Sequence, residues 1–148
     1  MAGLFDLTGK RALITGSSQG IGLALAHGLA QAGAQVILNG RDEAKLGAAV
    51  AAIPGAVSLV FDATDHAAVR AAVDGFESGH GPIDILVNNA GMQHRGPLED
   101  FAPEAFERLL QTNITTVFNV GQACARHMIA RGAGKIINIA SVQTALAR

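Results

Sequence analysis

The chain has 148 residues, of which 49% are hydrophobic and 16% are charged, and its formal net charge is -1. This length suits one domain with a core of its own, and the charge balance argues against a nucleic-acid-binding protein, which usually has a basic excess. No apolar run approaches the roughly 18 residues of a membrane span, the N-terminus does not resemble a signal peptide, and a single cysteine excludes an internal disulfide, so we expect a cytoplasmic protein.

Short apolar runs alternate along the chain with longer segments of helical periodicity. Gly33 is placed to end the first helix, Asp42 to cap the second, and Pro103 to begin the last. The predicted elements, in chain order, are strand 11–15, helix 21–32, strand 35–39, helix 42–53, strand 57–61, helix 65–78, strand 83–88, helix 103–131 and strand 135–140.

The strand segments are continuous apolar runs, which predicts that the strands are buried on both faces. Connections as long as a helix require parallel pairing and right-handed crossovers. The sequence therefore predicts an α/β protein with a doubly wound parallel sheet of the Rossmann type, in three layers. We expect residues 1–148 to form one dinucleotide-binding domain.

The stretch TGSSQGIG joins the first strand to the first helix. A turn at this place presents backbone N–H groups and the positive end of a helix dipole to a phosphate, and glycines let the phosphate approach. We expect a pyrophosphate on Gly20 and Ile21, with the hydroxyls of Ser17 and Ser18 as further donors. The alternative is that the glycines only build a tight turn, and their spacing departs from G-x-G-x-x-G. The predicted cofactor-binding residues here are Gly16, Ser17, Ser18, Gln19, Gly20, Ile21 and Gly22.

The second predicted strand ends at Asn39, and Gly40 and Arg41 follow. A unit that binds NAD usually carries an acid near this point, which holds the ribose 2′-hydroxyl. Here a glycine takes that place, and the guanidinium of Arg41 can pair with a 2′-phosphate. The sequence therefore predicts NADP(H); the alternative is a solvated arginine at a helix start.

Taken together, these residues resemble the short-chain dehydrogenase/reductase family. Its T-G-x-x-x-G-x-G and N-N-A-G patterns are matched by residues 15–22 and 88–91, its adenine-reading aspartate by Asp62, its helix asparagine by Asn113, and its catalytic serine by Ser141. The resemblance covers essentially the whole chain. Beyond the glycine turn, it and the reasoning above predict as cofactor-binding residues Asn39, Arg41, Asp62, Ala63, Asn89, Ala90 and Gly91.

The resemblance implies hydride transfer between a nicotinamide cofactor and a CH–OH group. It also implies that Ser141 donates a hydrogen bond to the substrate oxygen and that Asn113 helps to hold a water. The family's tyrosine and lysine, in Y-x-x-x-K, follow the serine by about a dozen residues, and this chain ends at Arg148 with no tyrosine at all. We therefore expect an N-terminal part of a longer enzyme, truncated after the fifth strand, inactive and prone to aggregation on its own.

Within the family, stretches such as VILNGRD and PIDILVNNAGMQHRGPLEDF look most like the gluconate 5-dehydrogenases. This implies interconversion of D-gluconate and 5-keto-D-gluconate with NADP(H). Gln93, His94, Arg95 and Gln143 are candidates for contacting the sugar acid, because a carboxylate favours a cation; the alternative is that they are solvated loop residues. Two other functions stay open: a 3-oxoacyl-[acyl-carrier-protein] reductase, and a nucleotide-binding module without catalysis.

The long predicted helix at 103–131 carries apolar residues on more than one face. One face is expected to cover the sheet. Family resemblance implies that the other packs in a homo-oligomer, a dimer or a homotetramer; the alternative is burial within the missing half. The histidines are scattered without ligand spacing, so we predict no metal site.

Overall fold

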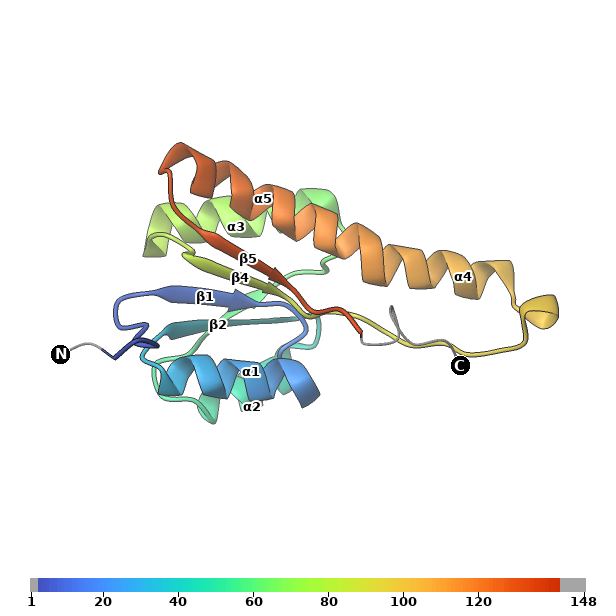
Figure 1. Ribbon diagram of the computed structural model, residues 1–148, viewed down its shortest axis with the longest axis horizontal. Coiled ribbons are helices and arrows are strands. Elements are labelled where there is room, and N and C mark those ends of the chain that lie inside the picture. The colour runs from blue at the N-terminus through green and yellow to red at the C-terminus, as the bar shows by residue number, and fades with distance from the viewer. Residues whose placement is uncertain (1–2, 142–148) are drawn as a thin grey trace.

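The computed structural model describes residues 3–141. Five parallel strands form one sheet in the order β3-β2-β1-β4-β5, with helices on both faces (Figure 1). The strands are β1 (Arg11–Ile14), β2 (Gln35–Gly40), β3 (Val57–Val60), β4 (Ile85–Asn88) and β5 (Lys135–Asn138). The helices are α1 (Gly20–Gln31), α2 (Glu43–Ala51), α3 (His66–His80), α4 (Pro103–Leu110) and α5 (Thr116–Ala130).

The strand order confirms the predicted doubly wound sheet. From the central β1 the chain first builds outward through β2 and β3, and then returns to the other side of β1 to build β4 and β5. Leu13 of β1 therefore pairs with Ile37 on one side and with Leu86 on the other. The reversal of direction beside β1 opens a crevice at the carboxyl ends of the strands, which is where ligands bind in sheets of this kind.

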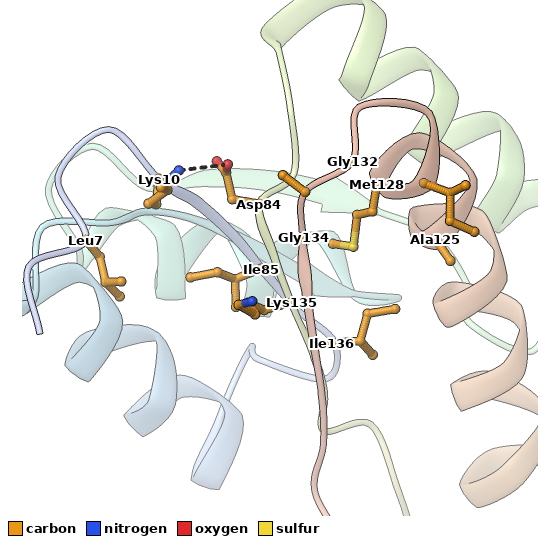
Figure 2. A pocket seen from close by; sticks show the side chains of 12 residues that line it. Leu7, Lys10, Asp84, Ile85, Ala125, Met128, Gly132, Gly134, Lys135 and Ile136 are labelled. Carbon is orange, nitrogen blue, oxygen red and sulfur yellow. Dashed lines mark hydrogen bonds and ion pairs between the residues drawn. The ribbon is translucent and has the colours of Figure 1, made fainter.

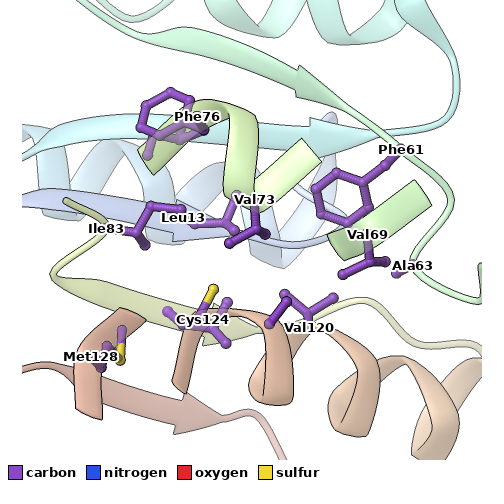
Figure 3. Close-up of a cluster of buried hydrophobic side chains, with 13 residues drawn as sticks. Leu13, Phe61, Ala63, Val69, Val73, Phe76, Ile83, Val120, Cys124 and Met128 are labelled. Atoms are coloured by element: carbon purple, nitrogen blue, oxygen red, sulfur yellow. The ribbon is translucent and has the colours of Figure 1, made fainter. Parts of the chain in front are cut away.

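Alternate residues of each strand enter different layers of the core. Leu13 and Ile37 point to the layer of α3 and α5, where they join Val73, Val120 and other buried side chains (Figure 3). Ile14, the residue after Leu13 in β1, belongs to the second cluster, under α1 and α2. The sheet therefore lies between two helical layers, as predicted.

The prediction that the strands are buried on both faces is confirmed for the inner strands and is wrong for the two outer ones. All four residues of β4 are buried, whereas those of β3 alternate between exposed and half-buried, and all four of β5 are exposed. The reason is topological, because β3 and β5 form the edges of this sheet. A run of apolar residues does not reveal which strand becomes an edge.

The single long helix predicted at 103–131 is divided in the structure. A π-helical turn, Gln111–Thr115, separates α4 from α5, and α4 extends beyond the carboxyl ends of the strands (Figure 1). A 3₁₀ turn, Leu98–Asp100, precedes α4 and was not predicted. No helix in the described part of the chain is long and apolar enough to cross a membrane.

Candidate functional site

A cavity of about 350 Å³ lies at the carboxyl ends of β1–β4 and reaches the π-helical turn. Most residues predicted to bind the cofactor line it. These are Gly16, Ser18, Gln19, Asn39, Arg41, Asp62, Ala63, Asn89, Ala90 and Gly91. Lining residues that were not predicted are Gly40, Asp42, Lys45, Phe61, Thr64, Thr112 and Thr116.

The glycine turn packs directly against the loop after β4. Gly16 has a φ of 62°, and a Cβ built on it would lie 2.9 Å from the Cα of Ala90. A Cβ on Gly22 would collide with the backbone carbonyl oxygen of Gly16 and would lie 2.5 Å from Nδ2 of Asn89. Both glycines are therefore required by close approach of the backbone. Gly20 has open space around it and a φ of 60°, so its role is conformational.

Hydrogen bonds join the same two segments. Nδ2 of Asn89 donates to the carbonyls of Thr15 and Gly16, at 3.0 and 3.2 Å. The hydroxyl oxygen of Thr15 accepts from the backbone N–H groups of Asn89 and Ala90. Helix α1 begins beside them after Gln19, with no side-chain cap. Its first N–H groups are therefore oriented as an anion site requires.

Ser17 does not have the role that the sequence suggested. Its side chain is fully buried, and its Oγ donates to the carbonyl of Ile14 at 2.8 Å and accepts from the N–H of Asn39 at 3.0 Å. The hydroxyl proton is used inside the protein, so Ser17 is not a phosphate donor. Gly20, Ile21 and Gly22 also stand outside the lining of the cavity, and Ile21 is 69% exposed.

Asp62 and Arg41 face each other across the outer part of the cavity. Nη1 of Arg41 lies 3.4 Å from Oδ2 of Asp62, and Oδ1 of Asp62 accepts from the N–H and the hydroxyl of Thr64. Partial burial acts to raise the pKa of Asp62, but the hydrogen bonds from Thr64 and the charge of Arg41 outweigh it and lower the pKa. Asp62 is therefore ionised at neutral pH.

The loop that carries Asp62 is held by the long helical segment. Nδ2 of the buried Asn119 donates to the carbonyls of Ala63 and Thr64, at 3.1 and 3.3 Å. Nε2 of Gln111 donates to the same Thr64 carbonyl at 3.4 Å. Asn119 was missed at the sequence level, because only the fold brings α5 beside the end of β3.

Asn113 lies in the π-helical turn and holds the loop after β4. Its Oδ1 accepts from the N–H of Met92 at 2.8 Å, and its Nδ2 donates to the Met92 carbonyl at 3.0 Å. The oxygen and the nitrogen of the Asn113 amide are thus both hydrogen-bonded to the backbone of Met92, which lies outside the helix that carries Asn113. The side chain of Asn113 therefore positions the loop that continues into Gln93 and Arg95.

The remaining predicted residues that the structure describes lie outside the cavity. Gln93, His94 and Arg95 are exposed on the loop after β4, where Arg95 donates to Oε1 of Gln93 at 3.4 Å. Ser141 follows β5 at the carboxyl edge of the sheet and is exposed. Gln143 lies outside the described residues. Among residues 3–141, no three His, Cys, Asp or Glu side chains are grouped closely enough to hold a metal ion.

A larger cavity, about 740 Å³, lies at the opposite end of the strands (Figure 2). Met128 and Ile136 give it an apolar wall, and Lys10 pairs with Asp84 at its rim, 3.4 Å apart. It follows the open edge of β5 near the amino ends of β1 and β4. We assign the site to the smaller cavity, because ligands of doubly wound sheets bind at the carboxyl ends of the strands.

The short chain dehydrogenase family matches residues 10–147 of this sequence. The chain belongs to the short chain dehydrogenase family. The gluconate 5-dehydrogenase of Gluconobacter oxydans is 54% identical over 149 residues, a match that covers 98% of this chain. The 5-keto-D-gluconate 5-reductase of Escherichia coli K12 is 45% identical over 152 residues and covers all of it. The chain spans only 58% and 60% of the lengths of these two relatives.

The fold of the chain is also that of solved structures. A gluconate 5-dehydrogenase from Burkholderia cenocepacia, crystallised with NADP and tartrate, superimposes with a TM-score of 0.92 at 56% identity. That superposition covers 97% of this chain and 58% of the other. The crevice described above therefore belongs to a fold that binds NADP in the structure from Burkholderia cenocepacia.

Proposed function

We propose that the complete protein is an NADP(H)-dependent oxidoreductase that interconverts D-gluconate and 5-keto-D-gluconate. The observation that carries this proposal is the end of β2. Arg41 lines the cavity there, and Gly40 stands in the place of the acid that an NAD-binding unit uses. The two relatives and the structural neighbour named above act on gluconate or its 5-keto form according to their names.

The residues of the crevice fit the proposed cofactor. The uncapped start of α1 and the turn at Gly16 suit the pyrophosphate, and the cation of Arg41 suits a 2′-phosphate. When bound, the nicotinamide would supply or accept the hydride. The role of the protein is then to bind and orient the cofactor and the substrate and to transfer the proton.

Two residues of this chain are proposed to act on the substrate. Ser141 stands at the carboxyl end of β5, where its hydroxyl would donate to the oxygen that changes between alcohol and ketone. Arg95 stands on the loop that Asn113 holds through Met92. Its guanidinium would pair with the carboxylate of the sugar acid.

The test is a steady-state assay of the complete protein. We expect reduction of NADP⁺ by D-gluconate, with a much lower kcat/KM for NAD⁺. Reduction of an acetoacetyl thioester by NADPH, without activity on gluconate, would instead support an oxoacyl reductase. Tight binding of NADPH without turnover of either substrate would support a nucleotide-binding module and would contradict the enzyme.

The same proposal includes a homo-oligomer assembled through α4 and α5. Phe106, Leu110, Ile114 and Phe118 follow one another at intervals of four residues, and each is at least 44% exposed. An exposed apolar stripe of this kind is typical of a protein interface. Light scattering of the complete protein is expected to give a dimer or a tetramer, and Phe118→Glu is expected to shift it towards the monomer; a monomeric wild type would refute this part.

A further inference from the structure

Lys45 occupies an unusual place for a lysine. It is the third residue of α2, where its backbone N–H donates to Oδ1 of the capping Asp42 at 3.0 Å. The positive end of the helix dipole disfavours a cation in this turn. The side chain is 64% exposed, so packing does not explain it. Among the described residues, the only ion pair of its ammonium is a long one, to Asp42 at 3.8 Å. A residue that breaks a local rule with so weak a compensating contact is a candidate for function.

The side chain of Lys45 lines the same cavity as Arg41, and the two cations have similar surroundings. Arg41 is paired with Asp62 at 3.4 Å, and Nζ of Lys45 lies 3.8 Å from Oδ2 of Asp42. Both pairs are long and largely exposed to solvent, so each holds its cation weakly. A phosphate with a double negative charge is a stronger partner than either carboxylate.

Ser18 lies beside the end of β2. A Cβ built on Gly40 would lie 3.6 Å from Oγ of Ser18, at ordinary contact distance. Ser18 is half-buried and lines the cavity, so its hydroxyl is available there as a neutral donor. Two cations and one hydroxyl therefore line the cavity into which β2 ends, together with the carboxylates of Asp42 and Asp62.

We propose that Lys45 is a second specificity-determining residue, which with Arg41 forms a two-cation site for the 2′-phosphate of NADP(H). The inference rests on the proposed use of NADP(H). Binding exchanges partners, because the phosphate takes Lys45 from Asp42 and Arg41 from Asp62. The carboxylate of Asp42 still caps α2 through the N–H of Lys45, so the exchange leaves the helix intact.

The experiment titrates the complete protein with NADPH and with NADH. In Lys45→Met, we expect affinity for NADPH to fall roughly fivefold to tenfold, less than for the loss of a buried charge-assisted hydrogen bond, because the site is largely exposed to solvent. Affinity for NADH should change by less than about twofold, because NADH lacks the phosphate. Lys45→Arg keeps the charge and should keep the preference for NADPH.

Lys10→Met is the matched control. Lys10 is also half-exposed and paired with an aspartate, but it lies at the other cavity. Lys10→Met should change neither the affinity for NADPH nor the affinity for NADH. Equal loss of NADPH and NADH binding in Lys45→Met, or an unchanged ratio, would overturn the role of Lys45. If the wild type itself fails to bind NADPH, the proposed function is overturned, and this outcome is separate from the first.

Discussion

Replacing Ser17 with alanine is expected to destabilise the fold rather than weaken cofactor binding directly. The fully buried Oγ accepts from the N–H of Asn39 and donates to the carbonyl of Ile14. Alanine would leave the Asn39 N–H buried without this acceptor, at a cost of about 1–3 kcal/mol, and would remove a further bond worth about 0.5–1.5 kcal/mol. We therefore expect a loss of about 1.5–4.5 kcal/mol in the free energy of unfolding.

The measurement is thermal unfolding of the complete protein, followed by circular dichroism. At about 2–4 °C per kcal/mol for a chain of this size class, the expected fall in Tm is on the order of 5–15 °C. Ser18→Ala is the matched control, because Ser18 lines the cavity and is only half-buried. It should weaken NADPH binding while its Tm stays within about 2 °C of the wild type. If Ser17→Ala kept its Tm and lost NADPH binding, Ser17 would be a ligand for the phosphate after all, and the reasoning would be wrong.

Three further outcomes are expected. Arg41→Asp should move the ratio of kcat/KM values from NADP⁺ towards NAD⁺ by at least about tenfold, since it replaces a cation with a charge that repels the phosphate; an unchanged ratio would remove Arg41 as selector. The hydrogen bond with His127 Nε2, at 2.7 Å, lowers the pKa of Asp74 below its ordinary value. The stabilising contribution of this bond is small because Asp74 is 45% exposed; it is present above the ordinary pKa of an aspartate and is lost as the pH falls through the lowered pKa. The stability difference between wild type and Asp74→Asn should accordingly shrink in that acidic range, and a difference that grew on acidification would contradict this assignment. Burial raises the pKa of Cys124 to about 12, so a disulfide reagent at pH 8 should label it only after unfolding; rapid labelling of the native protein would show that the core is open there.

The chain superimposes on the Burkholderia cenocepacia structure, which holds NADP, but it spans only about 58% of the length of that chain. The two cavities illustrate why position matters more than size. The larger one follows the open edge of β5, whereas the smaller one gathers the glycine turn, Arg41 and Asp62 at the carboxyl ends of the strands.

Local patterns in the sequence were sufficient for the order and type of the main elements. Apolar runs and helical periodicity are properties of neighbouring residues, and Asp42 caps α2 as its position predicted. The glycine turn and Arg41 were also readable, because a phosphate site at the first turn needs residues that lie close together in the chain. The parallel sheet then follows from the length of the connections.

Contacts between distant segments decided the rest. The sequence treats Ser17 and Ser18 alike, yet the fold buries one hydroxyl against Asn39, 22 residues away, and leaves its neighbour at the cavity. Asn113 meets Met92 over 21 residues, and the edge positions of β3 and β5 depend on the whole strand order. The residue type determines which hydrogen bonds a side chain is able to make. Only the tertiary structure determines the partner, because the chain must close a long loop before the two groups are in contact.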